Sequence, residues 1–144
     1  APQTCYRQLN LTSNPLGYNG AKVICTATWS KSLTRLWLAW CMVGPTGAKA
    51  LAKFLSHPDC CLKELNLNEN GVNVEGALDI AQSLEVNKSL SLLLLGGNGL
   101  YDKGTVAMSK AIVVNRTLTQ LSLAHNVIRQ EGAWALIQAL KVNT

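Results

Sequence analysis

The sequence has few of the residues from which catalytic and metal-binding sites are built. Its 144 residues include two histidines, and they do not form an H-x-x-x-H pair. The adjacent Cys60 and Cys61 lack the second pair in the C-x-x-C arrangement of a zinc site. No glycine lies in a phosphate-binding G-x-x-x-x-G-K-S/T or G-x-G-x-x-G motif. The sequence therefore predicts a protein that is not an enzyme and holds no metal and no cofactor.

Long apolar runs are also absent. A membrane-spanning helix needs roughly 18 apolar residues, whereas the longest run here, 90–95, is short and contains Ser91. We expect this run to be a strand, and we expect no association with a membrane.

The five cysteines are an odd number at irregular spacing, so they do not indicate a disulfide framework. We expect Cys25 and Cys41 to be buried thiols, because free cysteine is among the most buried residue types. This pattern favours a reducing, cytoplasmic setting.

Acidic residues are missing from the first part of the chain. Residues 1–58 carry six basic and no acidic residues (+6), and residues 59–144 carry seven basic and eight acidic residues (7 − 8 = −1). The net charge of +5 is therefore a property of the N-terminal part. It would steer an acidic partner toward that end of the protein.

What the sequence does contain is one repeated unit. The stretch 62–89, LKELNLNENGVNVEGALDIAQSLEVNKS, is its most regular example, and the pattern L-x-x-L-x-L-x-x-N/C followed by a glycine recurs along the chain. The five copies span about 6–32, 33–61, 62–89, 90–117 and 118–144, and we refer to them as copies one to five. A fixed period in this range predicts a solenoid.

This pattern resembles the leucine-rich repeat family, with Cys41 in place of asparagine in copy two. The Gly-Ala or Gly-Thr before each helix and the links VNKSL and VNRTL resemble the ribonuclease-inhibitor-like subclass. The segments ALKVNT and VNRTL are most similar to sequences in the repeat domains of NOD-like receptors. The resemblance implies a protein-binding or ligand-sensing module of innate immunity. Such a module binds a separate protein or packs against other domains of its own chain.

The repeat predicts a right-handed α/β solenoid that forms a single domain over 1–144. The leucines of L-x-L point inward, since side chains alternate along a strand. Apolar residues at helical spacing, such as Ala48, Leu51, Ala52 and Leu55 in copy two and Ala133, Leu136, Ile137 and Leu140 in copy five, are expected to pack behind the strands. Strands lie about 4.8 Å apart and helices are about 10 Å wide, so the parallel sheet must line the concave face.

Two recurring polar and small positions have expected structural roles. The turn asparagines Asn14, Asn70, Asn98 and Asn126 should bond to backbone groups buried between copies. Asn10, Asn87 and Asn115 match the N-glycosylation pattern, but the shared repeat position of Asn87 and Asn115 favours a role in the link between helix and strand. The glycines at 20, 47, 76, 104 and 132 are expected at helix starts under close packing.

Binding is expected on the outward strand positions of the concave face. Trp37 and Trp40 are unusual there, as are Leu92 and Leu94, because exposed apolar patches mark interaction sites. Arg35 beside two tryptophans has the composition of a hot spot. The alternative is that the tryptophans pack on each other and on Arg35, or are covered by another part of the protein. The predicted partner-binding residues are Arg35, Trp37, Trp40, Glu64, Asn66, Glu69, Leu92, Leu94, Gln120, Ser122 and His125.

Two other functions remain open at this stage. Ran GTPase-activating proteins resemble the same repeat subclass, but they carry a long acidic tail and more copies, and Arg35 is the only obvious inner-face arginine after Arg7. Nucleic-acid binding through the basic copies one and two is a weaker alternative. Neither end has the polar terminal repeat that solenoids need for solubility, so we expect a fragment of a longer protein, or else association through open ends.

Overall fold

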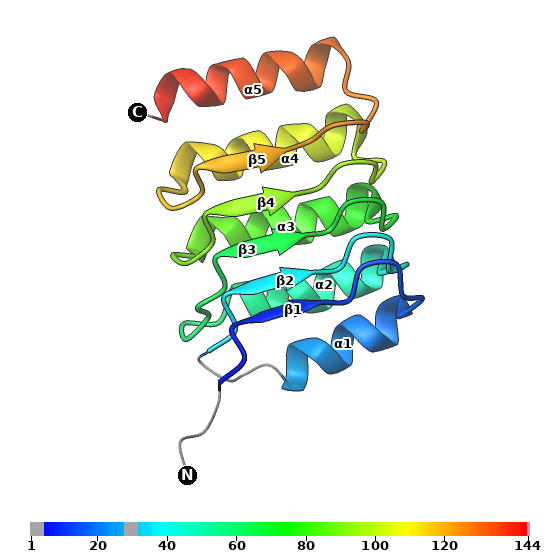
Figure 1. Cartoon of the computed structure of the whole chain (residues 1–144). Helices are drawn as coiled ribbons and strands as arrows, with labels where there is room; N and C mark the ends of the chain where they lie inside the picture. The colour runs from blue at the N-terminus through cyan, green and yellow to red at the C-terminus, as the bar shows by residue number, and fades with distance from the viewer. Residues whose placement is uncertain (1–4, 28–31, 144) are drawn as a thin grey trace.

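The computed structural model describes residues 5–27 and 32–143, which form five strand–helix units in a row. The five strands make one parallel sheet in the order β1-β2-β3-β4-β5, and the helices lie in a second layer behind it (Figure 1). The predicted α/β solenoid is confirmed. The elements are β1 (Gln8–Asn10), α1 (Gly17–Ala27), β2 (Arg35–Trp37), α2 (Gly44–Leu55), β3 (Glu64–Asn66), α3 (Asn73–Val86), β4 (Leu92–Leu94), α4 (Tyr101–Val114), β5 (Gln120–Ser122) and α5 (Gln130–Val142).

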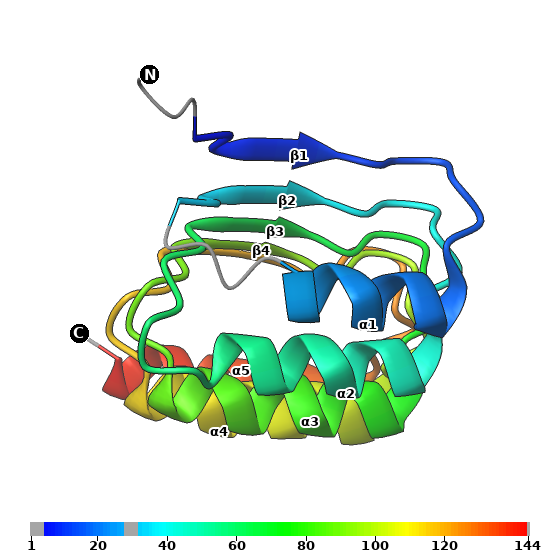
Figure 2. The ribbon, with the colours of Figure 1, turned by 90° about the horizontal axis from the view of Figure 1, so that it is seen from below.

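The core lies between the sheet and the helices, which Figure 2 shows as two separate layers. The central strand residues Leu36, Leu65 and Leu93 are opposite one another in the sheet and fully buried. Because side chains alternate along a strand, the residues on either side of each leucine point away from the core. These outward positions form the concave face.

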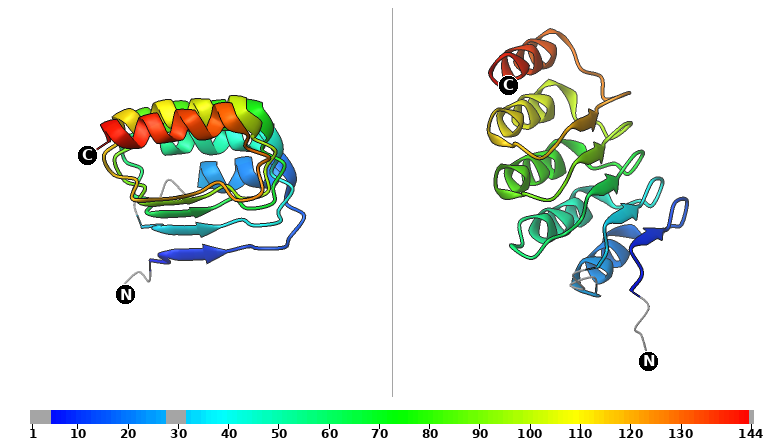
Figure 3. Two further views of the ribbon diagram at one scale, coloured as in Figure 1. Left: turned by 90° about the horizontal axis from the view of Figure 1, so that it is seen from above. Right: turned by 60° about the vertical axis from the view of Figure 1, so that its left-hand side comes forward.

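The helix stripe predicted for copy two is buried, but the one predicted for copy five is not. Ala48, Leu51 and Leu55 of α2 are 0% exposed, whereas Ile137 and Leu140 of α5 are 49% and 62% exposed. Inner helices have a further helix packed on this side, whereas α5 lies at the end of the helix layer (Figure 3). Trp134 of α5 is also 63% exposed, although half-buried packing is the default for a tryptophan on the helix side. Trp29, for which the same packing is the default, is outside the described residues.

The turn asparagines connect neighbouring copies as predicted. Oδ1 of Asn70 accepts hydrogen bonds from the N–H groups of Cys41 and Val43, and its Nδ2 donates to the Leu38 carbonyl. Asn98 and Asn126 make the same bonds one and two copies later. All three are at most 2% exposed, so they satisfy backbone groups that water cannot reach.

Copy one departs from this arrangement in two ways. Asn14 is exposed and donates only to the nearby Leu11 and Thr12 carbonyls, so its predicted role between buried copies was wrong. Cys41 is fully buried, and its thiol donates to the carbonyls of Leu11 and Ala39. A thiol reproduces the donor half of an asparagine amide and has no matching oxygen acceptor, so the turn of copy one is only partly completed.

The helix-start glycines let adjacent helices approach closely, as predicted. A Cβ on Gly76 would lie 2.8 Å from the Cβ of Ala48 on the preceding helix, and one on Gly104 would lie 3.2 Å from the Cβ of Ala77. Gly47 and Gly132 have equivalent neighbours in Ala21 and Thr105. The helix spacing at this point therefore leaves no room for a side chain.

The link asparagines form a second set of contacts between copies. Nδ2 of Asn87 donates to the Leu55 carbonyl at 2.8 Å, and Nδ2 of Asn115 donates to the Leu84 carbonyl at 2.7 Å. Their Oδ1 atoms accept from the first N–H groups of the following strand segment, at Ser89 and Leu90 and at Thr117 and Leu118. Both residues are buried, which confirms the predicted role of the link.

Candidate protein-binding face

The concave face consists of two rows of outward side chains from the strands. The first residues of the strands are register partners across the whole sheet, and so are the third residues. The rows are Gln8, Arg35, Glu64, Leu92 and Gln120, and Asn10, Trp37, Asn66, Leu94 and Ser122. The sheet therefore gathers onto one surface residues that are 27 to 29 positions apart in sequence.

A third row follows at the turn after each strand, and all of its members have left-handed backbone. Their φ values lie between +55° and +64°. Glycine tolerates this conformation, but a bulky residue in it is an outlier that the surrounding structure must enforce. Trp40, with φ of +57°, is the bulkiest of them. The row is Ser13, Trp40, Glu69, Gly97 and His125.

Copy two presents the main apolar patch of this face. Trp37 is 39% exposed and Trp40 is 60% exposed. Met42, which the sequence analysis did not select, is 69% exposed and also has a positive φ of +58°. The sequence feature that could have identified Met42 is its position in the repeat, which copies three and four fill with Gly71 and Gly99, both at positive φ. We call Trp37, Trp40 and Met42 the copy-two patch.

Arg35 is not a free hot-spot arginine. Its Nε donates to Oε1 of Glu64 on the neighbouring strand at 2.9 Å, and the two side chains are 44% and 28% exposed. The pair neutralises two charges in the middle of the face. Both residues thus lie where the sequence placed them, but they act on each other.

The other predicted residues lie on copies three to five of the face. Leu92 and Leu94 are half-buried in β4, and Oδ1 of Asn66 accepts from the Asn68 N–H at 3.0 Å. The Glu69 carboxylate occupies the space that a side chain on Gly97 would need. Gln120 and His125 are exposed and Ser122 is half-buried, at the copy-five end of the face.

The described part of the chain offers little reactive chemistry. It contains no group of three or more His, Cys, Asp or Glu residues that could hold a metal ion. The five cysteines are free. Burial raises the pKa of the Cys25 thiol to about 12, and the neighbouring Cys60 adds to this shift, so Cys25 is held as an unreactive thiol at neutral pH. Among the described helices, none is long and apolar enough to cross a membrane.

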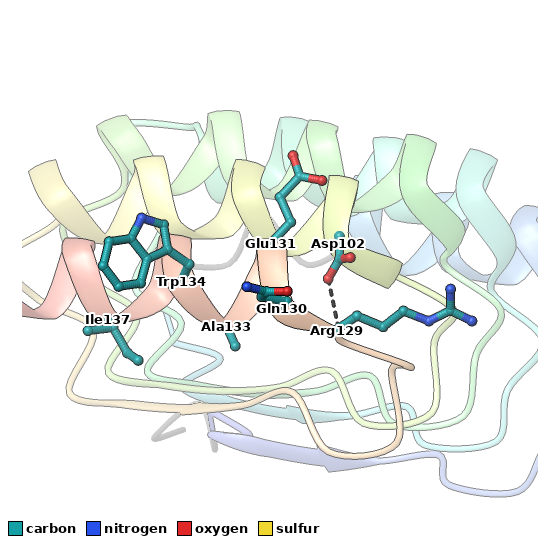
Figure 4. A pocket seen from close by; sticks show the side chains of 7 residues that line it. All are labelled: Asp102, Arg129, Gln130, Glu131, Ala133, Trp134 and Ile137. Carbon is teal, nitrogen blue, oxygen red and sulfur yellow. Dashed lines mark hydrogen bonds between the residues drawn. The ribbon is translucent and has the colours of Figure 1, made fainter.

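A separate hollow lies at the copy-five end of the solenoid. It has a volume of about 830 Å³ and is lined by Asp102, Arg129, Gln130, Glu131, Ala133, Trp134 and Ile137. In Figure 4 the Asp102 carboxylate points to the backbone at Arg129, and the Trp134 ring lies over the other end of the hollow. The sequence analysis did not select this region as a site.

Comparison with known proteins gives the family. A family model described as "Leucine Rich repeat" matches residues 7–25, 30–52, 59–81 and 114–136. The chain is a leucine-rich repeat protein. Such repeat domains are generally protein-interaction modules, since stacked repeats create an extended concave surface.

Curated relatives support the predicted subclass of this leucine-rich repeat protein. It is 35% identical over 80 residues to ribonuclease inhibitor of Mus musculus and 36% identical over 86 residues to that of Sus scrofa. It is 35% identical over 96 residues to NACHT, LRR and PYD domains-containing protein 14 of Mus musculus. These matches cover 54%, 58% and 66% of the chain and 17%, 19% and 10% of the relatives. The leucine-rich repeat protein is therefore ribonuclease-inhibitor-like, and its match spans under a fifth of each relative.

Solved structures share its fold. The Leiomodin-1 Actin-Binding Site 2 structure aligns with a TM-score of 0.75 at 20% identity, over 95% of this chain and 80% of that one. The tropomodulin C-terminal domain of Caenorhabditis elegans aligns with a TM-score of 0.79 at 18% identity, over 98% and 86%. At these identities the likeness shows the fold alone.

Proposed function

We propose that this leucine-rich repeat protein binds a protein partner on its concave face, through the copy-two patch, as a regulatory or sensing module like the repeat domains of NOD-like receptors. The exposure of Trp37 and Trp40 carries the proposal. Tryptophans are enriched at hot spots of protein interfaces. A solvated strand surface gains nothing from them, and water contact with two large rings is unfavourable.

Backbone conformation supports the same surface. Holding Trp40 and Met42 at positive φ costs about 1–2 kcal/mol each compared with an ordinary conformation. At the positions in register with Trp40 and Met42, Gly97, Gly71 and Gly99 avoid this cost. The remaining positive-φ residues at these positions are Ser13, Glu69, His125 and Val127, all smaller than tryptophan. Two large apolar residues in these strained, exposed positions fit a surface selected for contact with a partner.

The charges of the face favour an apolar contact over an electrostatic one. Arg35 and Glu64 neutralise each other, and Glu69 adds a negative charge. The concave face thus gives no support for an acidic partner. A cytoplasmic setting fits the proposal because all five cysteines are free, including the exposed Cys5.

The alternative functions receive less support from the geometry. A GTPase-activating role would need an accessible inner-face arginine, and Arg35 is paired with Glu64. For nucleic acid, the basic residues of copies one and two would have to share one surface. They are divided between the strand side, with Arg7 and Arg35, and the helices, with Lys22, Lys49 and Lys53.

The test compares the wild-type chain with the Trp37→Ser/Trp40→Ser double variant as immobilised bait in cytosolic extract. Trp134→Ser is the matched control, because Trp134 is 63% exposed on α5, away from the concave face. Captured proteins are quantified by mass spectrometry, and the affinity of the main one is then measured with purified protein. Circular dichroism and unfolding midpoints verify that all variants are folded.

We expect the double variant to lose binding by about tenfold or more, since a hot-spot tryptophan contributes about 2 kcal/mol or more. The Trp134→Ser control should bind like the wild type. Equal binding by the double variant would reject the concave face as the binding surface.

A further inference from the structure

The concave face carries one charge that is not neutralised. Its three rows contain one basic and two acidic residues (1 − 2 = −1, with His125 neutral). Arg35 and Glu64 pair with each other. Within the described residues, the Glu69 carboxylate has no hydrogen-bond or ion-pair partner. The negative charge of this face is therefore that of Glu69.

Glu69 lies between Trp40 and Gly97 in the third row. The Trp40 N–H donates to the Asn68 carbonyl at 3.0 Å, and the Glu69 N–H donates to the Gly96 carbonyl at 2.8 Å, so the three turns lie side by side. All three row members have positive φ, between +56° and +64°. Because adjacent strands are about 4.8 Å apart, a ligand group at Glu69 is within reach of both neighbours.

The Glu69 side chain lies over Gly97, where copy four has no side chain. A Cβ on Gly97 would lie 2.6 Å from Oε2 of Glu69 and closer still to Oε1. Beside it, Oδ1 of Asn68 accepts a hydrogen bond from the Gly96 N–H at 2.7 Å. Glu69 is half-buried, so its carboxylate is held over bare backbone.

An exposed ring and a half-buried leucine lie beside this carboxylate. Trp40 is its neighbour in copy two, and Leu94 ends the strand of copy four, three residues before Gly97. The register partners of Leu94 are the polar Asn66 and Ser122, so the repeat does not require a leucine there. We call Trp40, Glu69, Leu94 and Gly97 the Glu69 site.

An aromatic ring, an aliphatic surface and a carboxylate together complement an arginine side chain. The methylene stem of arginine packs on apolar surface while its head group stays polar. The planar guanidinium stacks on aromatic faces and pairs with a carboxylate through two parallel N–H donors. A lysine ammonium is more strongly hydrated and lacks this planar geometry. A metal ion would need more oxygen ligands than one carboxylate supplies.

We propose that the Glu69 site binds an arginine side chain of the partner protein, with the guanidinium between the Trp40 ring and the Glu69 carboxylate and the stem over Leu94. This inference rests on the proposed function. It describes the partner as a protein that presents an arginine next to the apolar side chains that cover the copy-two patch. An acidic side chain is disfavoured at this place, since it would be repelled by Glu69.

The experiment titrates the purified whole chain with N-acetyl-arginine methylamide. Binding is followed by the NMR signal of the Trp40 indole N–H, which a Trp40→Phe variant assigns. N-acetyl-citrulline methylamide has nearly the same shape without the charge, and N-acetyl-leucine methylamide tests a purely apolar occupant. We expect saturable binding of the arginine compound in the millimolar range, and binding of the other two compounds weaker by about fivefold or more.

Two variants separate the charge of Glu69 from its position. Glu69→Gln removes the charge at nearly constant size and should weaken arginine binding by about fivefold or more. Gly97→Ser keeps the charge but places an atom where the carboxylate lies. Serine tolerates the backbone there, since Ser13 has φ of +63° at the equivalent position. Gly97→Ser should therefore weaken arginine binding as well.

Glu85→Gln is the matched control for the change in net charge. Glu85 is exposed on α3, in the helix layer, so this variant should bind the arginine compound like the wild type. Circular dichroism and unfolding midpoints verify that each variant is folded.

Three results would overturn the arginine proposal. They are the absence of saturable arginine binding in the millimolar range, equal binding of the arginine compound and either of the other two, and unchanged arginine binding by Glu69→Gln. Each is measured without the partner protein and so does not depend on its capture.

Capture from cytosolic extract distinguishes this proposal from the proposed function. The Glu69→Gln bait should capture less of the main partner than the wild type or Glu85→Gln. If Glu69→Gln captures the partner fully and Trp37→Ser/Trp40→Ser does not, the arginine is wrong and the concave binding face stands. Full capture by Trp37→Ser/Trp40→Ser would instead reject the binding face itself, and the arginine proposal with it.

Discussion

The backbone N–H of Asn98 donates a hydrogen bond to Oδ1 of Asn126 at 2.9 Å. The two residues occupy the same turn position in successive copies. Asn98 in turn accepts from the N–H groups of Asn70 and Val72. Each buried turn is thus completed by the copy that follows it, so that the stability of one copy depends on a side chain of the next.

Asn98→Ala should lower the free energy of unfolding by about 1–3 kcal/mol, because it leaves the buried Asn70 and Val72 N–H groups and the Leu67 carbonyl without a partner. Chemical denaturation measures the change. Asn14→Ala is the matched control, and its effect should be much smaller, since Asn14 is exposed. Equal effects of the two substitutions would contradict the role of burial.

Cys41→Asn should stabilise copy one by about 1 kcal/mol, by adding the acceptor that the thiol lacks. The Asn14 N–H is equivalent to the Cys41 N–H, which donates to Asn70 Oδ1 at 3.0 Å. Hydrogen exchange at Asn14 should slow, and the denaturation midpoint should rise. Cys41→Ala, which adds no acceptor, should instead destabilise the protein; a gain in both variants would point to some other cause.

Gly76→Ala should destabilise the protein by about 1–3 kcal/mol through overpacking. The new Cβ would lie 2.8 Å from the Cβ of Ala48 and 2.7 Å from Cγ1 of Val72. The double variant Gly76→Ala/Ala48→Gly removes the first of these contacts. A double-mutant cycle from denaturation curves should show favourable coupling between the two substitutions, whereas strict additivity would mean that the helices separate without cost.

The Cys25 thiol should resist alkylation at pH 8 while the protein is folded, and the exposed Cys5 should react readily. Burial and the neighbouring Cys60 raise the pKa of Cys25 from 9.0 to about 12. Folding therefore favours the neutral thiol, and this contribution to stability is complete below pH 9 and is lost as the pH rises toward 12. Iodoacetamide labelling followed by mass spectrometry gives the order of reaction, and rapid labelling of Cys25 in the folded protein would refute its burial.

The concave face shows which features the repeat pattern can predict and which it cannot. Its period assigned the outward strand positions correctly, including Trp37, because strand alternation depends only on local sequence. Trp40 is exposed as well, but it lies in the left-handed turn after β2. It missed Met42, since the left-handed turn that exposes this side chain follows from packing between copies. It placed Arg35 beside the tryptophans and did not pair it with Glu64, 29 residues later.

The sequence alone determined the solenoid: its period, its buried leucines, its glycine positions and its asparagine turns all follow from a pattern repeated within each copy. The tertiary structure decided which residues of that pattern are buried and which of their backbone groups are hydrogen-bonded. Leu140 has the same spacing as Leu84, yet it is 62% exposed against 1%. Identical local sequences differ in burial and hydrogen bonding because in a solenoid each unit is completed by its neighbour, and only the three-dimensional arrangement shows where a neighbour lies.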